Sequence, residues 1–300
     1  MRAIVLTSFS GIDGLELTEV ADAVPADGEK LVQVRAASLG PWDLQGANGE
    51  FAAIGGSTEF PQVQGWDFAG ETDDGERVLG CVAQPWMGVG AFAESIAVPA
   101  AVLAPLPDSL GFPEGSALPV SGITAGLLVD AAGVSDGDVA LVSGAAGMVG
   151  GFATQLAIGC GATVVAGVRD SDADEARRLG AELVVDTGDE LEAVIRTEWP
   201  RGVDACIDTV GLGPRALACV RDGGSFVTSI PRSVPDADRD IAPETVQAQP
   251  DANATSELAR RAAGNELTVR LAETLPLKAF RDAYTRLQRG GLHGKIILTP

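Results

Sequence analysis

The stretch Val139-Ala-Leu-Val-Ser-Gly-Ala-Ala-Gly-Met-Val-Gly150 decides how the middle of this 300-residue sequence folds. An apolar strand pattern runs into a glycine-rich turn, and a helical pattern over residues 149 to 159 follows at once. The start of such a helix presents unpaired backbone N–H groups, to which a pyrophosphate can bind. Gly147 would let the backbone approach the phosphates, and Gly150 would let the helix pack on the strand. The alternative is a tight turn that binds no ligand.

The same alternation of strand and helix continues downstream. Predicted strands cover residues 163 to 168, 183 to 185, 203 to 208 and 225 to 230. Predicted helices cover residues 172 to 179, 190 to 198 and 214 to 220. Strands that are apolar along their whole length need helices on both faces of their sheet. This part of the chain is therefore predicted to be an α/β fold with a Rossmann-type, doubly wound parallel sheet.

The end of the second predicted strand, Gly167-Val168-Arg169-Asp170, bears on which dinucleotide would bind. Folds that bind NAD place a carboxylate near this position to accept the ribose hydroxyls. Here a glycine stands near it and Arg169 follows, which can pair with the 2′-phosphate of NADPH. NADPH is therefore favoured as the cofactor. The alternative is that Arg169 is a solvated loop residue and that Asp170 takes the acidic role.

The first hundred residues have a different pattern, with short β-rich runs separated by Gly, Pro and Asp. The predicted strands cover residues 2 to 7, 30 to 37, 65 to 71, 77 to 82 and 91 to 98. This spacing predicts a largely antiparallel, barrel-like domain. After a polar surface excursion over residues 231 to 256, a helix is expected at 256 to 263. The tail is expected to form a strand, a helix at 277 to 288 and a strand at 295 to 298.

The composition excludes several classes of partner. Lys and Arg number 21 against 42 Asp and Glu, so the formal net charge is −21 and nucleic acid and anionic membranes are unlikely partners on electrostatic grounds. Only Lys30, Lys278 and Lys295 are lysines, so an anionic ligand must be held mainly by arginine and backbone N–H groups. No apolar run is long enough for a membrane span and no leader is recognisable. A soluble, unprocessed, cytoplasmic protein is expected.

The inventory of metal ligands is small. Cys81, Cys160, Cys206 and Cys219 show no C-x-x-C spacing, and His293 is the sole histidine, so no usual structural zinc site is expected. Cys160 and Cys206 lie in apolar runs and are expected to be inert core thiols, with redox or nucleophilic use as the alternative.

Seven motifs in order along the chain resemble those of the medium-chain dehydrogenase/reductase superfamily, closest to its zinc-independent quinone oxidoreductase and enone reductase branch. They are Ala36-Ala-Ser-Leu-Gly-Pro-Trp-Asp43, Gly65-Trp-Asp-Phe-Ala-Gly70, Gly88-Val-Gly-Ala-Phe-Ala-Glu94, Ala117-Leu-Pro-Val-Ser-Gly-Ile-Thr-Ala125, the turn from Ala145 to Gly150, Asp208-Thr-Val-Gly211 and Gly294-Lys-Ile-Ile-Leu298. The resemblance implies a GroES-like β-barrel domain at 1–117 and 265–300, a Rossmann domain at 118–264, and a cleft between them for nicotinamide and substrate.

The resemblance also implies where zinc-dependent relatives would hold their metal. Their ligand positions are Gly40, Trp66 and Ser121 here, and none of these can bind Zn²⁺ as a thiolate or imidazole would. The family's pocket asparagine is replaced by Gly40, and an aromatic hydroxyl found a few residues later aligns with Gln45. No metal is therefore expected, and the polarity of the pocket has changed.

The site residues that follow from the turn and from the resemblance form two sets. The expected cofactor-binding residues are Thr124, Ser143, Ala145, Ala146, Gly147, Met148, Val149, Gly150, Arg169, Thr209, Val210, Gly211, Ser229, Ile230 and Lys295. The expected substrate-pocket residues are Trp42, Asp43, Gln45 and Trp66. No catalytic residue is identified.

Several of these residues have two interpretations. Asp43 is expected to make a structural hydrogen bond, with general acid catalysis as the alternative. Trp42, Trp66 and Trp86 are expected to be wall or core rather than stacking platforms. Lys295 would reach the cofactor or would be a solvated edge residue. Tyr284 is expected to pack in the core and His293 to lie on the surface.

The expected activity is hydride transfer from NADPH to a quinone or an α,β-unsaturated carbonyl, a small-molecule substrate. An enoyl-thioester reductase and a non-catalytic NADPH-binding protein are the alternatives, because fold alone does not separate them. Residues 244 to 249 resemble the last Rossmann strand, which pairs across a two-fold axis in relatives. A homodimer is therefore expected.

Overall fold

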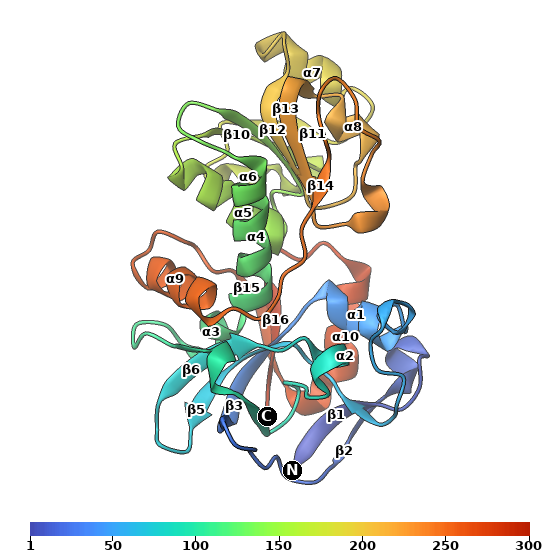
Figure 1. Ribbon diagram of the computed structural model, residues 1–300, viewed down its shortest axis with the longest axis vertical. Coiled ribbons are helices and arrows are strands. Elements are labelled where there is room, and N and C mark those ends of the chain that lie inside the picture. Colours follow the sequence, from blue (N-terminus) through green and yellow to red (C-terminus); the bar gives the residue numbers. More distant parts are fainter. The chain divides into compact units, whose positions relative to one another are not determined.

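The computed structural model describes all residues from 1 to 300 and divides into two compact units (Figure 1). The first, called the barrel unit below, comprises Met1–Val120 and Gln249–Pro300, and the second, the sheet unit, comprises Ser121–Ala248. The first break lies close to the expected one at residue 117. The second lies at residue 248 instead of 264, because helix α9 (Ala252–Ala263) packs on strands β6 and β8 of the barrel unit.

The sheet unit is built on six parallel strands in the order β11-β10-β9-β12-β13-β14. The strands are β9 (Val139–Ser143), β10 (Thr163–Val168), β11 (Leu183–Asp186), β12 (Val203–Asp208), β13 (Val220–Thr228) and β14 (Glu244–Thr245). The chain starts in the middle, winds to one edge, returns and winds to the other, which is the doubly wound order of a Rossmann fold. The prediction of an α/β fold is confirmed.

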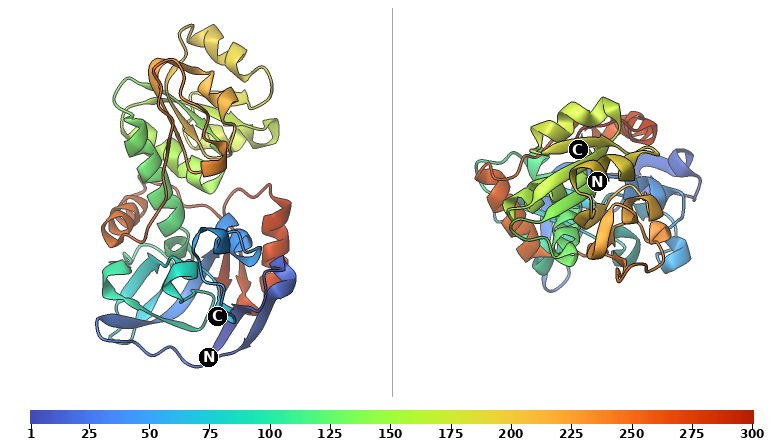
Figure 2. Two further views of the ribbon diagram at one scale, coloured as in Figure 1. Left: turned by 45° about the vertical axis from the view of Figure 1, so that its right-hand side comes forward. Right: turned by 90° about the horizontal axis from the view of Figure 1, so that it is seen from above.

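Helices connect these strands and lie around the sheet (Figure 2). They are α4 (Pro119–Ala132), which begins in the barrel unit, α5 (Met148–Gly159), α6 (Ala173–Arg178), α7 (Leu191–Glu198) and α8 (Pro214–Leu217). The helix predicted over 214 to 220 is shorter, because Val220 already pairs with Val203 at the start of β13. Strand β13 therefore begins five residues before the predicted 225.

The barrel unit has a seven-stranded, largely antiparallel sheet and a separate three-stranded one. The large sheet runs β15-β16-β3-β5-β6-β8, with β7 also paired to β3, and the small one runs β2-β1-β4. The strands are β1 (Arg2–Leu6), β2 (Leu15–Glu19), β3 (Glu29–Leu39), β4 (Gln62–Val63), β5 (Asp67–Thr72), β6 (Arg77–Cys81), β7 (Ser95–Pro99), β8 (Leu103–Pro105), β15 (Leu271–Pro276) and β16 (Lys295–Thr299). The tail thus returns to complete the sheet beside β3.

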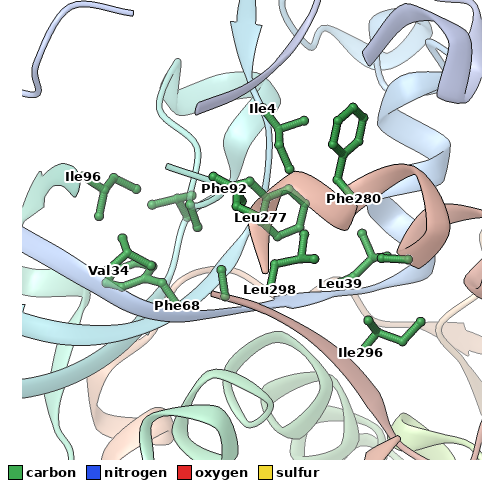
Figure 3. Packing of buried hydrophobic residues seen from close by; sticks show 14 of the residues in the cluster. Ile4, Val34, Leu39, Phe68, Phe92, Ile96, Leu277, Phe280, Ile296 and Leu298 are labelled. Atoms are coloured by element: carbon green, nitrogen blue, oxygen red, sulfur yellow. The ribbon is translucent and has the colours of Figure 1, made fainter. Parts of the chain in front are cut away.

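The core of the barrel unit lies among these strands and helix α10 (Phe280–Arg289) (Figure 3). Ile4, Phe68, Phe92 and Leu298 are fully buried there, from four strands or loops far apart in sequence. The strand predicted over 91 to 98 starts only at Ser95, because its first part makes a single bridge to β1 instead of a ladder. Tyr284 on α10 is fully buried, so the expectation that it packs in the core is confirmed.

The remaining helices of the barrel unit are short. They are α1 (Pro41–Ala47), α2 (Gln84–Met87) and α3 (Phe112–Ser116), and 3₁₀ turns occupy Gly11–Gly14, Ala52–Ile54, Ala100–Val102 and Leu277–Ala279. Two further 3₁₀ turns, Asp170–Asp172 and Pro231–Ser233, belong to the sheet unit. Helix α9 begins before the predicted residue 256, because the Asp251 carboxylate accepts hydrogen bonds from the N–H groups of Asn253 and Ala254 and caps it.

The expectations for two cysteines and the histidine meet different outcomes. Cys206 is buried as expected, but Cys160 is exposed, because it caps the end of α5 where the apolar run leaves the sheet. His293 is exposed, as expected. None of the helices combines the length and the apolar character that a membrane span requires.

Candidate functional site

The glycine-rich turn joins β9 to α5 at the carboxyl end of the central strand. Gly144 has a φ of +69°, which a residue with a side chain adopts only with strain, and its N–H donates to the carbonyl of Gly167 on β10 at 2.7 Å. Gly147 follows as the N-cap of α5, and its N–H donates to the Gly144 carbonyl at 2.8 Å. Ala145 and Ala146, between them, are buried. The turn is therefore followed directly by a twelve-residue helix, and the first N–H groups of this helix lie at this edge of the sheet.

The two other glycines of the motif differ in what surrounds them. A Cβ on Gly150 would lie 2.2 Å from the Gly144 carbonyl oxygen, so this position has no room for a side chain. A Cβ on Gly147 would meet only that same oxygen, at 3.2 Å, and otherwise open space. Gly150 is thus required by packing within the protein, whereas the space beside Gly147 is available to a ligand. Met148 and Val149 in the first turn of α5 are half-buried.

A buried carboxylate organises the neighbouring loop after β12. Asp208 is fully buried and accepts hydrogen bonds from the backbone N–H groups of Gly211 and Gly213, both at 2.9 Å. It also accepts from the Val210 N–H at 3.3 Å and from the Ser143 hydroxyl at 2.5 Å, and that hydroxyl in turn accepts from the Thr209 N–H at 3.0 Å. The ends of β9 and β12 are therefore locked together, and the loop after β12 is held in one conformation.

The loop after β13 is tied to the same strand. The Thr228 hydroxyl donates to the Asp208 carbonyl at 2.8 Å and accepts from the Ile230 N–H at 3.0 Å. Between this loop and the preceding one lies a cavity of about 300 Å³. Its lining residues are Val210, Gly211, Gly213, Pro214, Ile230, Arg232 and Ser233. Three of them, Val210, Gly211 and Ile230, belong to the predicted cofactor set.

Arg169 stands at the carboxyl end of β10, beside the glycine-rich turn. Its side chain is 64% exposed and forms an ion pair with Asp172 at 2.7 Å. The guanidinium is thus oriented by a partner three residues away, yet most of it faces solvent. The guanidinium can therefore bind an anion from solvent, because it does not have to leave a buried position first.

The structure brings most of the predicted cofactor residues together within the sheet unit. The turn, Arg169, Thr209 to Gly211, and Ser229 with Ile230 all follow carboxyl ends of neighbouring parallel strands, where ligands of open α/β sheets bind. Thr124 lies on α4 and is buried. Sequence reasoning missed Gly144, Asp208 and Arg232. The glycine that opens the glycine-rich turn and the aspartate that opens the D-T-V-G motif were available signals in the sequence, whereas Arg232 joins the cavity only through the fold.

A larger cavity of about 490 Å³ in the same unit is a poorer candidate. It lies beside α7 and α8 and shares only Pro214 with the smaller cavity, and Arg196 and Arg239 line it together with several carboxylates. Both arginines donate to backbone carbonyls, those of Ala218 and Leu217 among them, so they stabilise the loops around them.

The predicted substrate residues of the barrel unit belong to a group of aromatic side chains. The ring centroids of Trp66 lie 6.4 Å from Trp42, 5.4 Å from Phe51 and 6.1 Å from Trp86. The rings are tilted or edge-on to each other, and Trp86 is 40% exposed. Gln45 on α1 is half-buried. Three of the four predicted pocket residues, Trp42, Asp43 and Gln45, thus lie on α1, and the fourth, Trp66, contacts it.

Next to Trp42 lies a buried group of charges. The Asp43 carboxylate is 1% exposed and accepts the Gly40 N–H at 2.8 Å, capping α1. Asp67 is fully buried and accepts the Val120 N–H at 2.8 Å and the Ser38 hydroxyl at 3.2 Å. The expected structural hydrogen bond of Asp43 is therefore present.

Lys295 completes this group. Its Nζ lies 3.7 Å from Asp67, which is an ion-pair distance but too long for a hydrogen bond, and 4.0 Å from the centroid of the Trp42 ring. Burial raises the pKa of Asp43 to about 8, which the Gly40 N–H and the Lys295 ammonium only partly offset. Burial also raises the pKa of Asp67 and lowers that of Lys295.

Two positions were expected for Lys295, one in contact with the cofactor and one in solvent at the edge of the sheet. It is 3% exposed on β16, an interior strand of the sheet, so it is not a solvated edge residue. It belongs to the barrel unit and not to the unit that carries the other predicted cofactor residues. Its observed partners are Asp67 and the Trp42 indole, and a contact between Lys295 and the cofactor stays a prediction.

The positions aligned with zinc ligands carry no metal-binding side chain, since Gly40 has none and Trp66 and Ser121 carry an indole and a hydroxyl. The chain also contains no group of three or more His, Cys, Asp and Glu side chains arranged to hold a metal ion.

Comparisons with known proteins agree with this architecture. A family model described as zinc-binding dehydrogenase matches residues 149–229. The chain is 33% identical over 246 residues to 2-methylene-furan-3-one reductase of Solanum lycopersicum, an alignment that covers 76% of this chain and 61% of that protein. It is 30% identical to trans-enoyl reductase caaB of Aspergillus niger, over 67% of this chain and 63% of that protein. The chain therefore spans about six tenths of the length of these curated relatives.

The solved structure of the quinone oxidoreductase from Coxiella burnetii superposes with a TM-score of 0.90 at 25% identity, covering 100% of this chain and 99% of that one. A barrel unit of the GroES-like kind joined to a Rossmann unit is the architecture of this class of proteins. The chain belongs to the medium-chain dehydrogenase/reductase superfamily.

Proposed function

We propose that the protein is an NADPH-dependent oxidoreductase that reduces a quinone or an α,β-unsaturated carbonyl without zinc. The observation that carries the proposal is the contrast within the glycine-rich turn. Gly150 has no room for a side chain for reasons internal to the protein, whereas Gly147 opens onto free space at a helix N-terminus. That combination suits a pyrophosphate approaching the backbone.

The chain's own residues fit the rest of the dinucleotide. Backbone N–H groups at the start of α5 would hold the pyrophosphate, and the cavity lined by Val210, Gly211 and Ile230 would hold the nicotinamide ribose. Arg169 would pair with the 2′-phosphate, since it is exposed and already oriented by Asp172. When bound, NADPH would supply the hydride, and the protein would bind, orient and exclude water.

The acceptor class is proposed from the relatives and from the barrel unit. The printed names of the relatives include a furanone reductase, a trans-enoyl reductase and a quinone oxidoreductase. Positions 40, 66 and 121 offer no thiolate or imidazole, so the carbonyl would have to be polarised by hydrogen-bond donors instead of Zn²⁺. The similarity to caaB favours an enoyl thioester as the second candidate substrate.

Calorimetric titration with NADPH and NADH tests the cofactor. We expect NADPH to bind more tightly than NADH, and Arg169→Ala to weaken NADPH binding by about 10- to 100-fold while leaving NADH binding unchanged, because a charged hydrogen bond to phosphate is lost. Arg178→Ala is the matched control, since Arg178 is similarly exposed and also paired three residues away, but to Glu175 on α6.

Equal affinity of the wild type for the two dinucleotides, or no heat with either, would contradict the proposal. Stopped-flow oxidation of NADPH in the presence of 1,4-quinones, 2-alkenals and enoyl thioesters then separates the substrates. Turnover confined to thioesters would select the second candidate, and binding without any turnover would leave a nucleotide-binding protein. Stoichiometric zinc by elemental analysis would contradict the metal-free reaction.

A further inference from the structure

The cavity between the loops after β12 and β13 of the sheet unit differs in charge from the rest of this acidic molecule. Its seven lining residues include one cation, Arg232, and no carboxylate. The larger cavity of the same unit is lined by four carboxylates and two arginines, and the formal net charge of the chain is −21. An anion that enters the smaller cavity therefore meets a positively charged wall.

The side chain of Val210 connects this cavity to the glycine-rich turn. A Cβ on Gly144 would lie 2.4 Å from Val210 Cγ1 and 2.8 Å from Thr209 Oγ1, so the start of the turn packs directly against the loop after β12. Val210 also lines the cavity and is 53% exposed. One side chain thus separates the cavity from the turn at which the proposed function places the pyrophosphate.

Arg232 is the middle residue of the 3₁₀ turn Pro231–Ser233, which hydrogen bonds hold in place. The N–H and the hydroxyl of Ser233 both donate to the Ile230 carbonyl, at 2.9 Å and 2.8 Å. The Ile230 N–H in turn donates to the Thr228 hydroxyl at 3.0 Å. The backbone at Arg232 is therefore fixed, while its side chain is exposed and can be reached by a ligand from solvent.

Arg232 and Arg169 lie beyond different strands of one sheet. Arg169 follows β10 and Arg232 follows β13, and the strand order β10-β9-β12-β13 puts three strand spacings between them. At roughly 4.8 Å per spacing, β10 and β13 lie about 14 Å apart, and β9, which carries the glycine-rich turn, lies between them. Two arginines placed in this way suit two anionic groups at different points of one extended ligand.

We propose that Arg232 pairs with the nicotinamide-side phosphate of the dinucleotide, whose ribose enters the cavity that Arg232 lines. The inference rests on the proposed function and assigns two phosphates to two arginines. Arg169 binds the 2′-phosphate, which only NADPH has, whereas Arg232 binds a phosphate that NADPH and NADH share. Arg169 therefore determines which dinucleotide is preferred, and Arg232 adds affinity for both, because a guanidinium makes charged hydrogen bonds to phosphate oxygens.

Binding of whole dinucleotides distinguishes the two arginines. Arg232→Met removes the charge and keeps a long side chain, and calorimetric titration should show that NADPH and NADH lose affinity by the same factor, about tenfold or more. Arg169→Ala should weaken NADPH alone. Arg215→Ala is the matched control, since Arg215 is 53% exposed and follows the lining residue Pro214 without lining the cavity itself. It should change either affinity by less than about threefold.

Fragments of the dinucleotide identify the group that Arg232 binds. Reduced nicotinamide mononucleotide carries the phosphate, and reduced nicotinamide riboside lacks it. The wild type should bind the mononucleotide more tightly than the riboside, and this difference should vanish in Arg232→Met. Adenosine 2′,5′-bisphosphate should lose affinity in Arg169→Ala and keep it in Arg232→Met. Equal losses for mononucleotide and riboside in Arg232→Met would show that Arg232 only shapes the cavity, which would contradict the inference. Where fragments bind too weakly to measure, the whole dinucleotides decide.

The acceptor is the other source from which an anion could reach Arg232. In that case Arg232→Met would raise KM for crotonyl-CoA but not for the neutral 2-cyclohexenone, and its affinity for NADPH would equal that of the wild type, which would overturn the inference. Circular dichroism checks that each variant folds. If NADPH binds in preference to NADH but Arg232→Met binds both as the wild type does, the inference fails while the proposed function stands. If neither dinucleotide binds, both fail.

Discussion

At the scale of single residues, the buried charges of the barrel unit are the most informative feature. Two fully buried carboxylates of this unit accept hydrogen bonds from backbone N–H groups, Asp43 from Gly40 and Asp67 from Val120. Both aspartates cap the start of a helix, α1 and α4 respectively, and the ammonium of Lys295 lies near both. One buried lysine therefore connects two helix caps and the indole of Trp42.

The raised pKa of Asp43 makes stability depend on pH in a defined direction. Its pKa is about 8 in the folded state against an ordinary value near 3.8, so between these values the folded protein holds a proton that the unfolded chain has released. The free energy of unfolding contributed by this group is thus fully present below about pH 4. It is lost as the pH rises to about 8, by up to about 1.4 kcal/mol per pH unit.

Urea denaturation of the wild type and Asp43→Asn between pH 5 and 9 measures this contribution. Since the amide does not titrate, the stability of the wild type relative to the variant should fall as the pH rises and should level off above about pH 8. The comparison removes the opposing effect of Lys295, whose lowered pKa is common to both proteins to a first approximation. Parallel stability curves would show that Asp43 is ionised in the folded state across this range.

At the scale of elements, the turn from β9 into α5 combines a packing requirement with a binding requirement. The turn is anchored to β10 through Gly144 and, through Ser143 and Asp208, to β12. The three central strands of the sheet unit are therefore joined at the edge where the helix begins. Within this rigid frame, Gly147 and Gly150 lie three residues apart and have opposite surroundings.

Replacing each of these two glycines by alanine should separate the effect on the free energy of unfolding from the effect on NADPH binding. Gly147→Ala should lower the free energy of unfolding by about 1 kcal/mol or less, as expected at an N-cap, but weaken NADPH binding at least about tenfold because the methyl group meets the phosphates. Gly150→Ala should cost about 1–3 kcal/mol, since its methyl group would overlap the Gly144 carbonyl. Thermal unfolding and calorimetry measure both quantities. Undiminished NADPH binding by Gly147→Ala would argue against a pyrophosphate at this turn.

At the scale of the whole molecule, the open edge of the Rossmann sheet bears on assembly. Strand β14 (Glu244–Thr245) is its last strand, pairs only with β13, and both of its residues are exposed. The Val246 N–H donates inward to the Thr228 carbonyl at 3.1 Å, so by strand alternation the Thr245 N–H faces outward. An exposed edge of this kind can pair with the same edge of a second copy around a two-fold axis.

We therefore predict a homodimer joined through β14. Light scattering after size-exclusion chromatography should give twice the chain mass of 30.6 kDa for the wild type. Thr245→Pro removes the outward N–H while sparing the inward hydrogen bonds, and should shift the mass to that of one chain. Thr285→Ala on α10 of the barrel unit serves as the control. A dimer that persists in Thr245→Pro would place the interface elsewhere.

Much of the fold of this protein could be predicted from its sequence, because the patterns that determine its strands and turns are local. Strands β9, β10 and β12 begin and end where their apolar runs do, and the Rossmann fold and the glycine-rich turn follow from strand, glycine and helix signals within about twelve residues. Boundaries set by distant partners were missed. The strand at 91 to 98 is shortened by its bridge to β1, and α9 joins the barrel unit through contacts with β6 and β8.

Only the tertiary structure decided how the substrate residues are arranged. Gly40, Trp42 and Asp43 are neighbours in the chain, but Lys295 reaches them from the opposite end because β16 pairs with β3. The lowered pKa of Lys295 and the position of its side chain beside Trp42 and Asp67 arise from that closure of the sheet. Local patterns carry propensity and periodicity, whereas desolvation and charge coupling depend on which distant groups folding brings together.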